Sequence, residues 1–160
     1  MSHHLLQRLH RLKEQKQEFA LKALEAMRRE VEQGKAELKA AKDALHASTA
    51  SYARKVDALY APILRTTTDL AGIEDVHSKI AALDLEQERL AESAQDAADH
   101  LEHLEEQSKD LSAAYAEAVR TTNKYHQLLN DLAIKAREEG ERLEELETEE
   151  ALASRRETLG

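Results

Sequence analysis

A regular series of apolar positions runs through the second half of the chain. From Ile73 to Leu146, the series advances in alternating steps of three and four residues. The polar members of the series are Gln87, Ser108, Thr122 and Glu139. A repeat of about 3.5 residues keeps one narrow seam on one side of an α-helix, which is typical of a coiled coil. We therefore expect a long helix over residues 73–156 with this series as its packing seam.

An earlier series predicts a first long helix over residues 4–60. Its apolar positions recur at every seventh residue, at Leu24, Val31, Leu38, Leu45, Tyr52 and Leu59. The companion positions after Met27 are small and include Gly34, which costs a helix about 1 kcal/mol relative to Ala. Gly34 is therefore either a point of close contact between helices or a tolerated weak point.

A separate apolar series lies nearer the N-terminus, at Leu5, Leu9, Leu12 and Phe19. It joins the later repeat only through an extra step near Ala20, which resembles a stutter in a coiled coil. The alternative is that this end of the helix packs on something other than the second helix. With basic residues beside it, the stretch 5–31 also fits a helix lying on a membrane surface.

Helix-breaking residues cluster between the two helices, at residues 61–72. Pro62 disfavours helix at Ala61, threonines occupy positions 66–68, and Asp69 is a favourable N-cap. Two long amphipathic helices joined by a short break predict an all-α fold, an antiparallel coiled-coil hairpin with a longer second helix. Residues 1–160 would then form a single elongated domain.

This hairpin leaves the end of the second helix without a partner in its own chain. If the turn centres near Thr67, the numbers of facing residues add up to about 134, so residues from about 131 to 160 extend past the first helix. Leu132, Leu143 and Leu146 continue the apolar seam there. An exposed apolar stripe is usually a contact site for another chain. The alternative is a frayed helix stabilised by its own Glu and Arg spacing.

Composition and charge limit the classes of function that this chain can have. The chain has 34% charged and 3% aromatic residues, so a thin seam replaces a thick core and no deep pocket for catalysis or a cofactor is expected. It has no Cys, no apolar run long enough to cross a bilayer and no signal-peptide core. The net charge of −9 argues against nucleic-acid binding. Residues 1–65 carry 13 basic and 8 acidic side chains, and residues 66–160 carry 10 and 24, which favours pairing of the two helices.

The histidines of the chain raise the possibility of a metal site, but the spacing of His100 and His103 does not favour one. His100 and His103 lie three residues apart on one helix, whereas a zinc site needs four ligands that converge from more than one element. A metal-dependent four-helix bundle would need inward Glu-x-x-His pairs, but the inward positions there are Ala97, Leu101 and Leu104. We expect no metal site, no cofactor and no catalytic residue.

Three local runs resemble the small coiled-coil stalk proteins of type III secretion systems. They are Tyr60-Ala-Pro-Ile63 before the break, Ala118–Tyr125 in the second helix, and the Glu-rich run Arg137–Glu150. The size and the two long helices also resemble this family, which comprises the flagellar FliJ group and the injectisome YscO/HrpO group. The resemblance implies a non-enzymatic protein on the cytosolic side of a bacterial secretion apparatus, used in motility, virulence or symbiosis.

The resemblance also implies partners. Members of the family insert into or cap the hexameric export ATPase, link it to the export gate in the membrane, and bind export chaperones. The partner-binding residues expected here are Leu5, Leu9, Leu12, Phe19, Leu132, Leu143 and Leu146 at one end, and Pro62 and Ile63 at the opposite tip. The alternative is a structural or tethering coiled coil unrelated to secretion, which would include dimeric forms.

Overall fold

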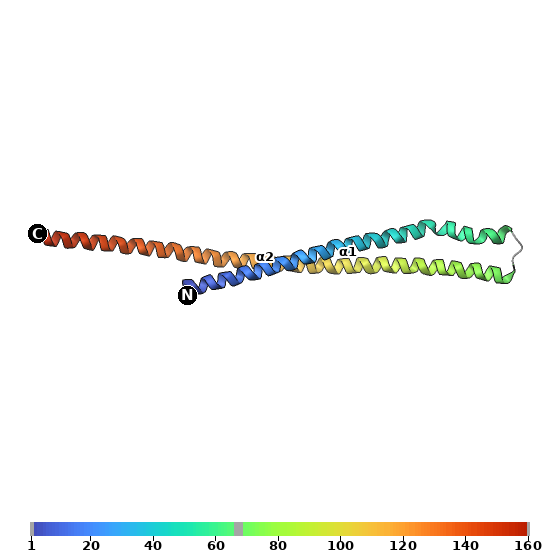
Figure 1. Cartoon of the computed structure of the whole chain (residues 1–160), viewed down its shortest axis with the longest axis horizontal. Coiled ribbons are helices and arrows are strands. Elements are labelled where there is room, and N and C mark those ends of the chain that lie inside the picture. Colours follow the sequence, from blue (N-terminus) through green and yellow to red (C-terminus); the bar gives the residue numbers. More distant parts are fainter. Residues whose placement is uncertain (1, 66–68, 160) are drawn as a thin grey trace. The chain divides into compact units, whose positions relative to one another are not determined.

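The structure is a computed structural model that describes residues 2–65 and 69–159. The described residues form two helices, α1 (His3–Arg65) and α2 (Leu70–Leu159), and no strand (Figure 1). The chain divides into two units. The first pairs the beginning of α1, up to Ala23, with α2 from Ser112 onward, and the second comprises Leu24–Leu111. In each unit α1 and α2 pack antiparallel, which confirms the predicted all-α hairpin fold.

Side-chain caps begin both helices. Ser2 Oγ accepts a hydrogen bond of 3.2 Å from the Leu5 N–H, and Asp69 Oδ1 accepts one of 3.0 Å from the Gly72 N–H. Each acceptor satisfies an N–H group that has no carbonyl partner within the first helical turn. The predicted N-cap at Asp69 is thus confirmed, and Ser2 is a second cap that the sequence analysis did not identify.

The helices extend into the predicted turn region. α1 continues through Pro62 to Arg65 instead of ending at residue 60, and α2 begins at Leu70 instead of residue 73. Pro62 lies in the last turn of α1, where proline removes a single backbone donor. Ile63, which follows it, is half-buried near Val76. Residues 66–68, where the predicted turn is centred, lie outside the described residues.

The predicted seam organises the second unit. Every seam position from Val76 to Leu111 is buried or half-buried, and on α1 Leu24 is only 1% exposed. Polar residues also meet across the seam, since Gln87 Nε2 donates to Thr49 Oγ1 at 2.9 Å and the Tyr52 hydroxyl donates to Asp84. The residue numbers of both pairs add up to 136, close to the predicted register.

Gly34 is a point of close contact between the helices. It is buried, and a Cβ atom placed on it would lie 3.2 Å from Leu104 Cδ1 and 3.3 Å from Leu101 Cδ1. Both distances are shorter than the optimal separation of about 3.5–4.0 Å between carbon atoms. The structure therefore favours the close-contact interpretation over a tolerated weak point.

The first unit has a polar seam on α1. Counting back from Leu24 in the same steps of three and four, the buried or half-buried positions of α1 are Ala20, Gln17, Lys13, His10 and Leu6. The predicted stutter near Ala20 is therefore wrong, because the inward positions keep one phase throughout. An analysis of apolar spacing missed this phase because three of the inward residues are polar.

Hydrogen bonding and ring contacts hold these polar residues between the helices. Thr122, only 8% exposed, has its Oγ1 2.9 Å from the Ala118 carbonyl oxygen on its own helix and 3.2 Å from the Lys13 carbonyl oxygen on α1. The His10 and His126 rings lie 5.7 Å apart between centroids, and Lys13 Nζ lies 5.8 Å from the centre of the Tyr125 ring. A buried polar group needs such partners to offset its desolvation.

Candidate functional site

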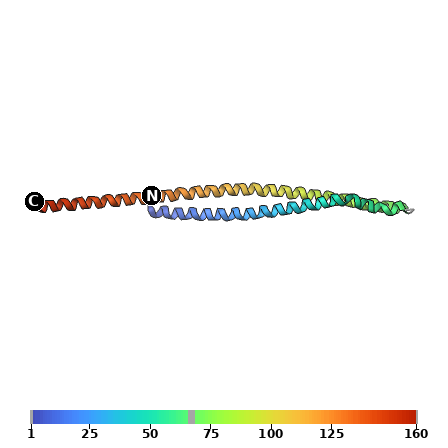
Figure 2. The same ribbon diagram turned by 90° about the horizontal axis from the view of Figure 1, so that it is seen from above.

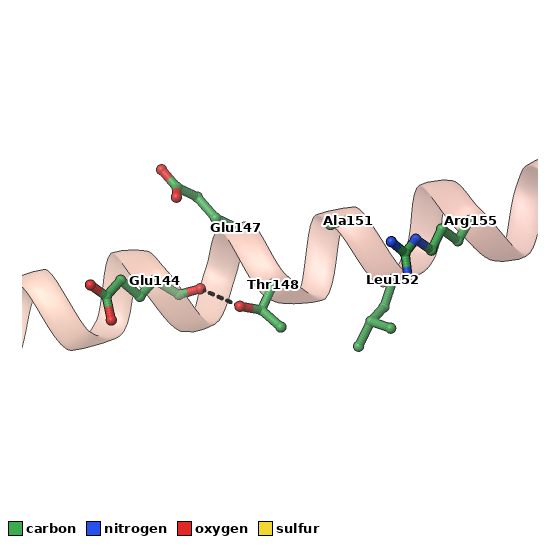
Figure 3. Close-up of a pocket in the computed structure, with 6 residues that line it drawn as sticks. All are labelled: Glu144, Glu147, Thr148, Ala151, Leu152 and Arg155. Carbon is green, nitrogen blue, oxygen red and sulfur yellow. Dashed lines mark hydrogen bonds between the residues drawn. The ribbon is translucent and has the colours of Figure 1, made fainter.

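The hollows on this protein are shallow. The one in Figure 3 lies on the last part of α2 alone, and is lined by Glu144, Glu147, Thr148, Ala151, Leu152 and Arg155. Its internal bond runs from the Thr148 hydroxyl to the Glu144 carbonyl oxygen, at 2.8 Å. The face of a lone helix does not enclose a small molecule as a ligand pocket does. Candidate function therefore rests on surfaces that fit another helix.

The histidines form no metal centre in the described parts of the chain. His100 and His103 are both exposed, and no group of three or more His, Asp and Glu side chains within residues 2–65 and 69–159 is placed to hold a metal ion. Neither α1 nor α2 contains a stretch apolar enough to cross a membrane.

An apolar stripe lies on the outside of α1 in the first unit. Leu5, Leu12 and Phe19 are exposed, Phe19 by 77%, and Leu9 is half-buried beside them. We call these four residues the outer stripe. The N-terminal apolar series thus forms one face of α1, but this face does not point toward α2. This agrees with the alternative that this end of the helix does not pack on the second helix through these residues. Exposed apolar residues at regular spacing on one helix face indicate a contact site for another helix.

Leu128 of α2 extends the outer stripe across the helix pair. Leu9 directly precedes the seam residue His10, and Leu128 directly precedes the seam residue Leu129. Successive residues turn by about 100° along a helix, so in an antiparallel pair the residues just before the seam project to the same side. Leu128 is exposed, and it widens the apolar face.

The opposite side of this unit is polar. There a shallow hollow is lined by His10, Glu14, Gln17, Glu18, Leu21, Thr122, Asn123 and His126. His10 Nε2 lies 3.1 Å from a carboxylate oxygen of Glu14 within it. The first unit thus has one apolar and one polar side, and the apolar side is the stronger candidate for docking a helix.

The end of α2 is a second candidate surface. In the first unit, Figure 2 shows α2 continuing beyond the N-terminus of α1 with no segment beside it. All residues from Ala133 to Thr158 are exposed, and Leu143 is 61% exposed. We call Ala133–Leu159 the C-terminal segment. Leu132 is half-buried and marks the end of the paired seam, whereas Leu143 and Leu146 lie beyond it and are fully available to a partner.

The tip of the second unit is a third candidate surface. Pro62 is exposed and Ile63, the other residue predicted to bind a partner there, is half-buried. Leu64 and Leu70 are both exposed there, and the sequence analysis did not single them out. The sequence feature that could have identified them is their place directly beside the predicted break between the helices.

The charge pairs on the surface do not build a site. The Arg120 guanidinium donates to Glu117 at 2.8 Å, and this hydrogen bond lowers the pKa of the Glu117 carboxyl. Arg89 lowers the pKa of Glu86 in the same way, at 2.7 Å. Both pairs are exposed and lie three residues apart on α2, so they support the helix weakly and do not activate a carboxylate.

Comparison with known proteins gives a match to a protein family and a match to a solved structure. The family of the type III secretion protein YscO matches residues 6–154 of the chain. A crystal structure of the type III secretion protein YscO from Vibrio parahaemolyticus is similar, with a TM-score of 0.83 and 22% sequence identity. The match covers 92% of this chain and 93% of that one, and at this identity it supports the fold. No curated protein matches the chain in sequence.

Proposed function

Since the chain belongs to the YscO family of type III secretion proteins, we propose that it is a non-enzymatic stalk component of a bacterial secretion apparatus. In this proposal it lies at the cytosolic face of the apparatus and bridges the export ATPase hexamer and the export-gate membrane protein. Binding of export chaperones is an additional role in the same proposal.

The main support for this proposal is the placement of the exposed apolar residues. A bridging protein needs at least two separate contact surfaces that stay exposed when the protein is folded. The outer stripe and the C-terminal segment supply such surfaces in the first unit, and Pro62, Ile63 and their exposed neighbours supply another in the second unit. Amphipathic helices of this kind bind by laying an apolar face into a groove of the partner.

The charge of the C-terminal segment adds a preference for a basic partner. Residues 138–150 contain eight Glu and a single basic residue, Arg142. Such a segment is attracted to a positively charged groove, and this attraction raises the association rate and weakens with added salt. Leu143 and Leu146 then supply the apolar part of the contact.

A binding assay with the soluble export ATPase of the same organism tests the proposal. We expect the purified protein to capture the ATPase and to increase its hydrolysis rate or the fraction of hexamer. Replacing Leu143 and Leu146 together by Ser should weaken capture because the apolar contact is lost. Leu85→Ser is the matched control, since Leu85 is 67% exposed and lies on α2 in the second unit.

The assay separates three results. Capture that is lost in the double variant and retained in Leu85→Ser supports the C-terminal segment as the contact. Equal capture by all variants contradicts that assignment and moves the contact to the outer stripe or to the Pro62 tip. No capture of the ATPase by the unaltered protein at micromolar concentration contradicts the stalk proposal itself.

A further inference from the structure

Two unpartnered helix faces of this protein have opposite charge. The paired part of α1 in the first unit, residues 3–23, carries five basic and two acidic side chains. The C-terminal segment of α2 carries five basic and nine acidic side chains, with eight of the acidic ones at residues 138–150. Opposite charge on two apolar stripes favours their association over pairing of either stripe with itself.

The spacing of the two stripes also matches. The outer stripe and its continuation advance through Leu5, Leu9, Leu12, Lys16 and Phe19 in steps of four, three, four and three residues. The seam of the C-terminal segment advances through Glu139, Leu143, Leu146, Glu150 and Ala153 in the same order of steps. A shared heptad spacing lets two helices pack side by side along these stripes.

We propose that two copies of this chain form a reciprocal dimer in which the C-terminal segment of each copy packs along the outer stripe of the other. Within one copy, α1 and the C-terminal segment run in opposite directions. A two-fold axis perpendicular to the helices reverses the direction of the second copy, so that its C-terminal segment runs parallel to α1 of the first. Both contacts are then identical, and the assembly closes as a dimer. The dimer covers the outer stripe and the C-terminal segment, so a second copy and the export ATPase compete for these two surfaces.

One register of this contact brings apolar residues together and pairs opposite charges. Its facing residues are Leu5 with Glu139, Leu9 with Leu143, Leu12 with Leu146, Lys16 with Glu150, and Phe19 with Ala153. At the flank, Arg8 reaches Glu147, which is the position that a residue preceding the seam meets in a parallel coiled coil. This register is favoured because it keeps two leucine pairs, whereas sliding either helix by one heptad leaves a single leucine pair and places Lys16 or Glu150 against a leucine.

The lengths of the two segments agree with this arrangement. Residues 3–23 of α1 span about 30 Å and the C-terminal segment spans about 40 Å, at about 1.5 Å per residue. The C-terminal segment therefore covers the whole outer stripe. Leu128 of α2 lies on the same side of the first unit and adds a second wall to the surface that receives it.

The molar mass of the purified chain across a concentration series tests the dimer. We expect sedimentation equilibrium to show a rise from the 18.0 kDa chain mass to twice that value. Lys16→Glu and Glu150→Lys should each weaken the dimer about tenfold or more, because each places like charges in both contacts. Leu85→Ser, far along the sequence from both segments, should dimerise as the unaltered chain does.

Mixing the two charge variants tests the pairing itself. In a mixed dimer, the contact between Glu at position 16 of one copy and Lys at position 150 of the other is restored, and the second contact keeps the native pair. An equimolar mixture of Lys16→Glu and Glu150→Lys should therefore dimerise with nearly the affinity of the unaltered chain. A mixture as weak as its components overturns the proposed register.

A disulfide trap distinguishes the dimer from a fold-back within one chain. The protein has no Cys, so a Leu12→Cys/Leu146→Cys variant carries the only two thiols. The proposal predicts a covalent dimer on mild oxidation. A cross-linked monomer, which a bend at Gly140 would allow, overturns the proposal. So does a molar mass of one chain at all concentrations, which would leave these faces to a different protein.

Discussion

Adding one methyl group at Gly34 tests how closely α1 and α2 approach in the second unit. Gly34→Ala brings two gains, about 1 kcal/mol from helix propensity and about 0.8 kcal/mol from burying a methyl group. Against them stands strain, because the new Cβ would lie 3.2 Å from Leu104 Cδ1 and 3.3 Å from Leu101 Cδ1. Overpacking of this kind costs about 1–3 kcal/mol.

How far the Leu104 side chain can move determines whether the gains or the steric strain are larger. Leu104 is only 6% exposed, so moving its side chain to make room costs buried packing. We therefore expect the gains and the strain to cancel, and the free energy of unfolding of Gly34→Ala to stay within about 1 kcal/mol of that of the unaltered chain. Gly34→Val adds two further carbon atoms at the same place and should destabilise the fold clearly.

A double-mutant cycle with Leu104→Ala separates the two terms. Leu104→Ala alone should destabilise by about 2–5 kcal/mol, but it removes the shorter of the two close contacts. In that background, Gly34→Ala should raise the free energy of unfolding by about 1–2 kcal/mol, measured by urea denaturation at one low protein concentration. A rise of nearly 2 kcal/mol for Gly34→Ala alone, or the same effect in both backgrounds, would refute the close contact.

The structure supports three further predictions. Leu24→Ala should lower the free energy of unfolding by about 2–5 kcal/mol in urea denaturation, because Leu24 is 1% exposed, and an unchanged midpoint would contradict its burial. Gly140→Ala meets no atom within 4 Å, so it should increase helicity in far-UV circular dichroism without the strain expected at Gly34. The hydrogen bond to Asp84 raises the pKa of the Tyr52 phenol above 10.0, so the stability it gives is present below that pH and lost as the pH rises through the higher folded-state pKa. Asp84→Ala should return this pKa toward its usual value in a spectrophotometric titration, and an unchanged titration would exclude the bond as the cause.

Most of α2 was predictable because its seam is apolar and keeps one phase. Spacing alone identified the residues that pack from Val76 to Leu132, and the assumption of a turn centred near Thr67 gave the register to within a few residues. The ends of the helices were less predictable. Pro62 locally disfavours helix, yet α1 continues through it to Arg65 with Ile63 half-buried.

The packing of the beginning of α1 was not predictable from apolar spacing, because most of its apolar residues are not the ones that face α2. His10, Lys13 and Gln17 are half-buried on the side of α1 that faces α2, while Leu12 and Phe19 face outward. The His10 ring lies near the His126 ring, and Lys13 Nζ lies near the Tyr125 ring. A periodicity analysis assigns the apolar row to the core. The candidate surfaces were predictable only in part for the same reason. The sequence indicated which residues are apolar, but the structure was needed to determine which of them remain exposed.

The constant register between α1 and α2 limits how the length of this protein can change in evolution. Within each unit, inserting one residue into a helix turns every later side chain by about 100° and takes the inward row out of the seam. Only a matched gain of seven residues in both helices restores the pairing. Insertions at the break disturb no position at which α1 and α2 pair. We therefore expect relatives to differ by whole heptads in the hairpin and by any number of residues at the break.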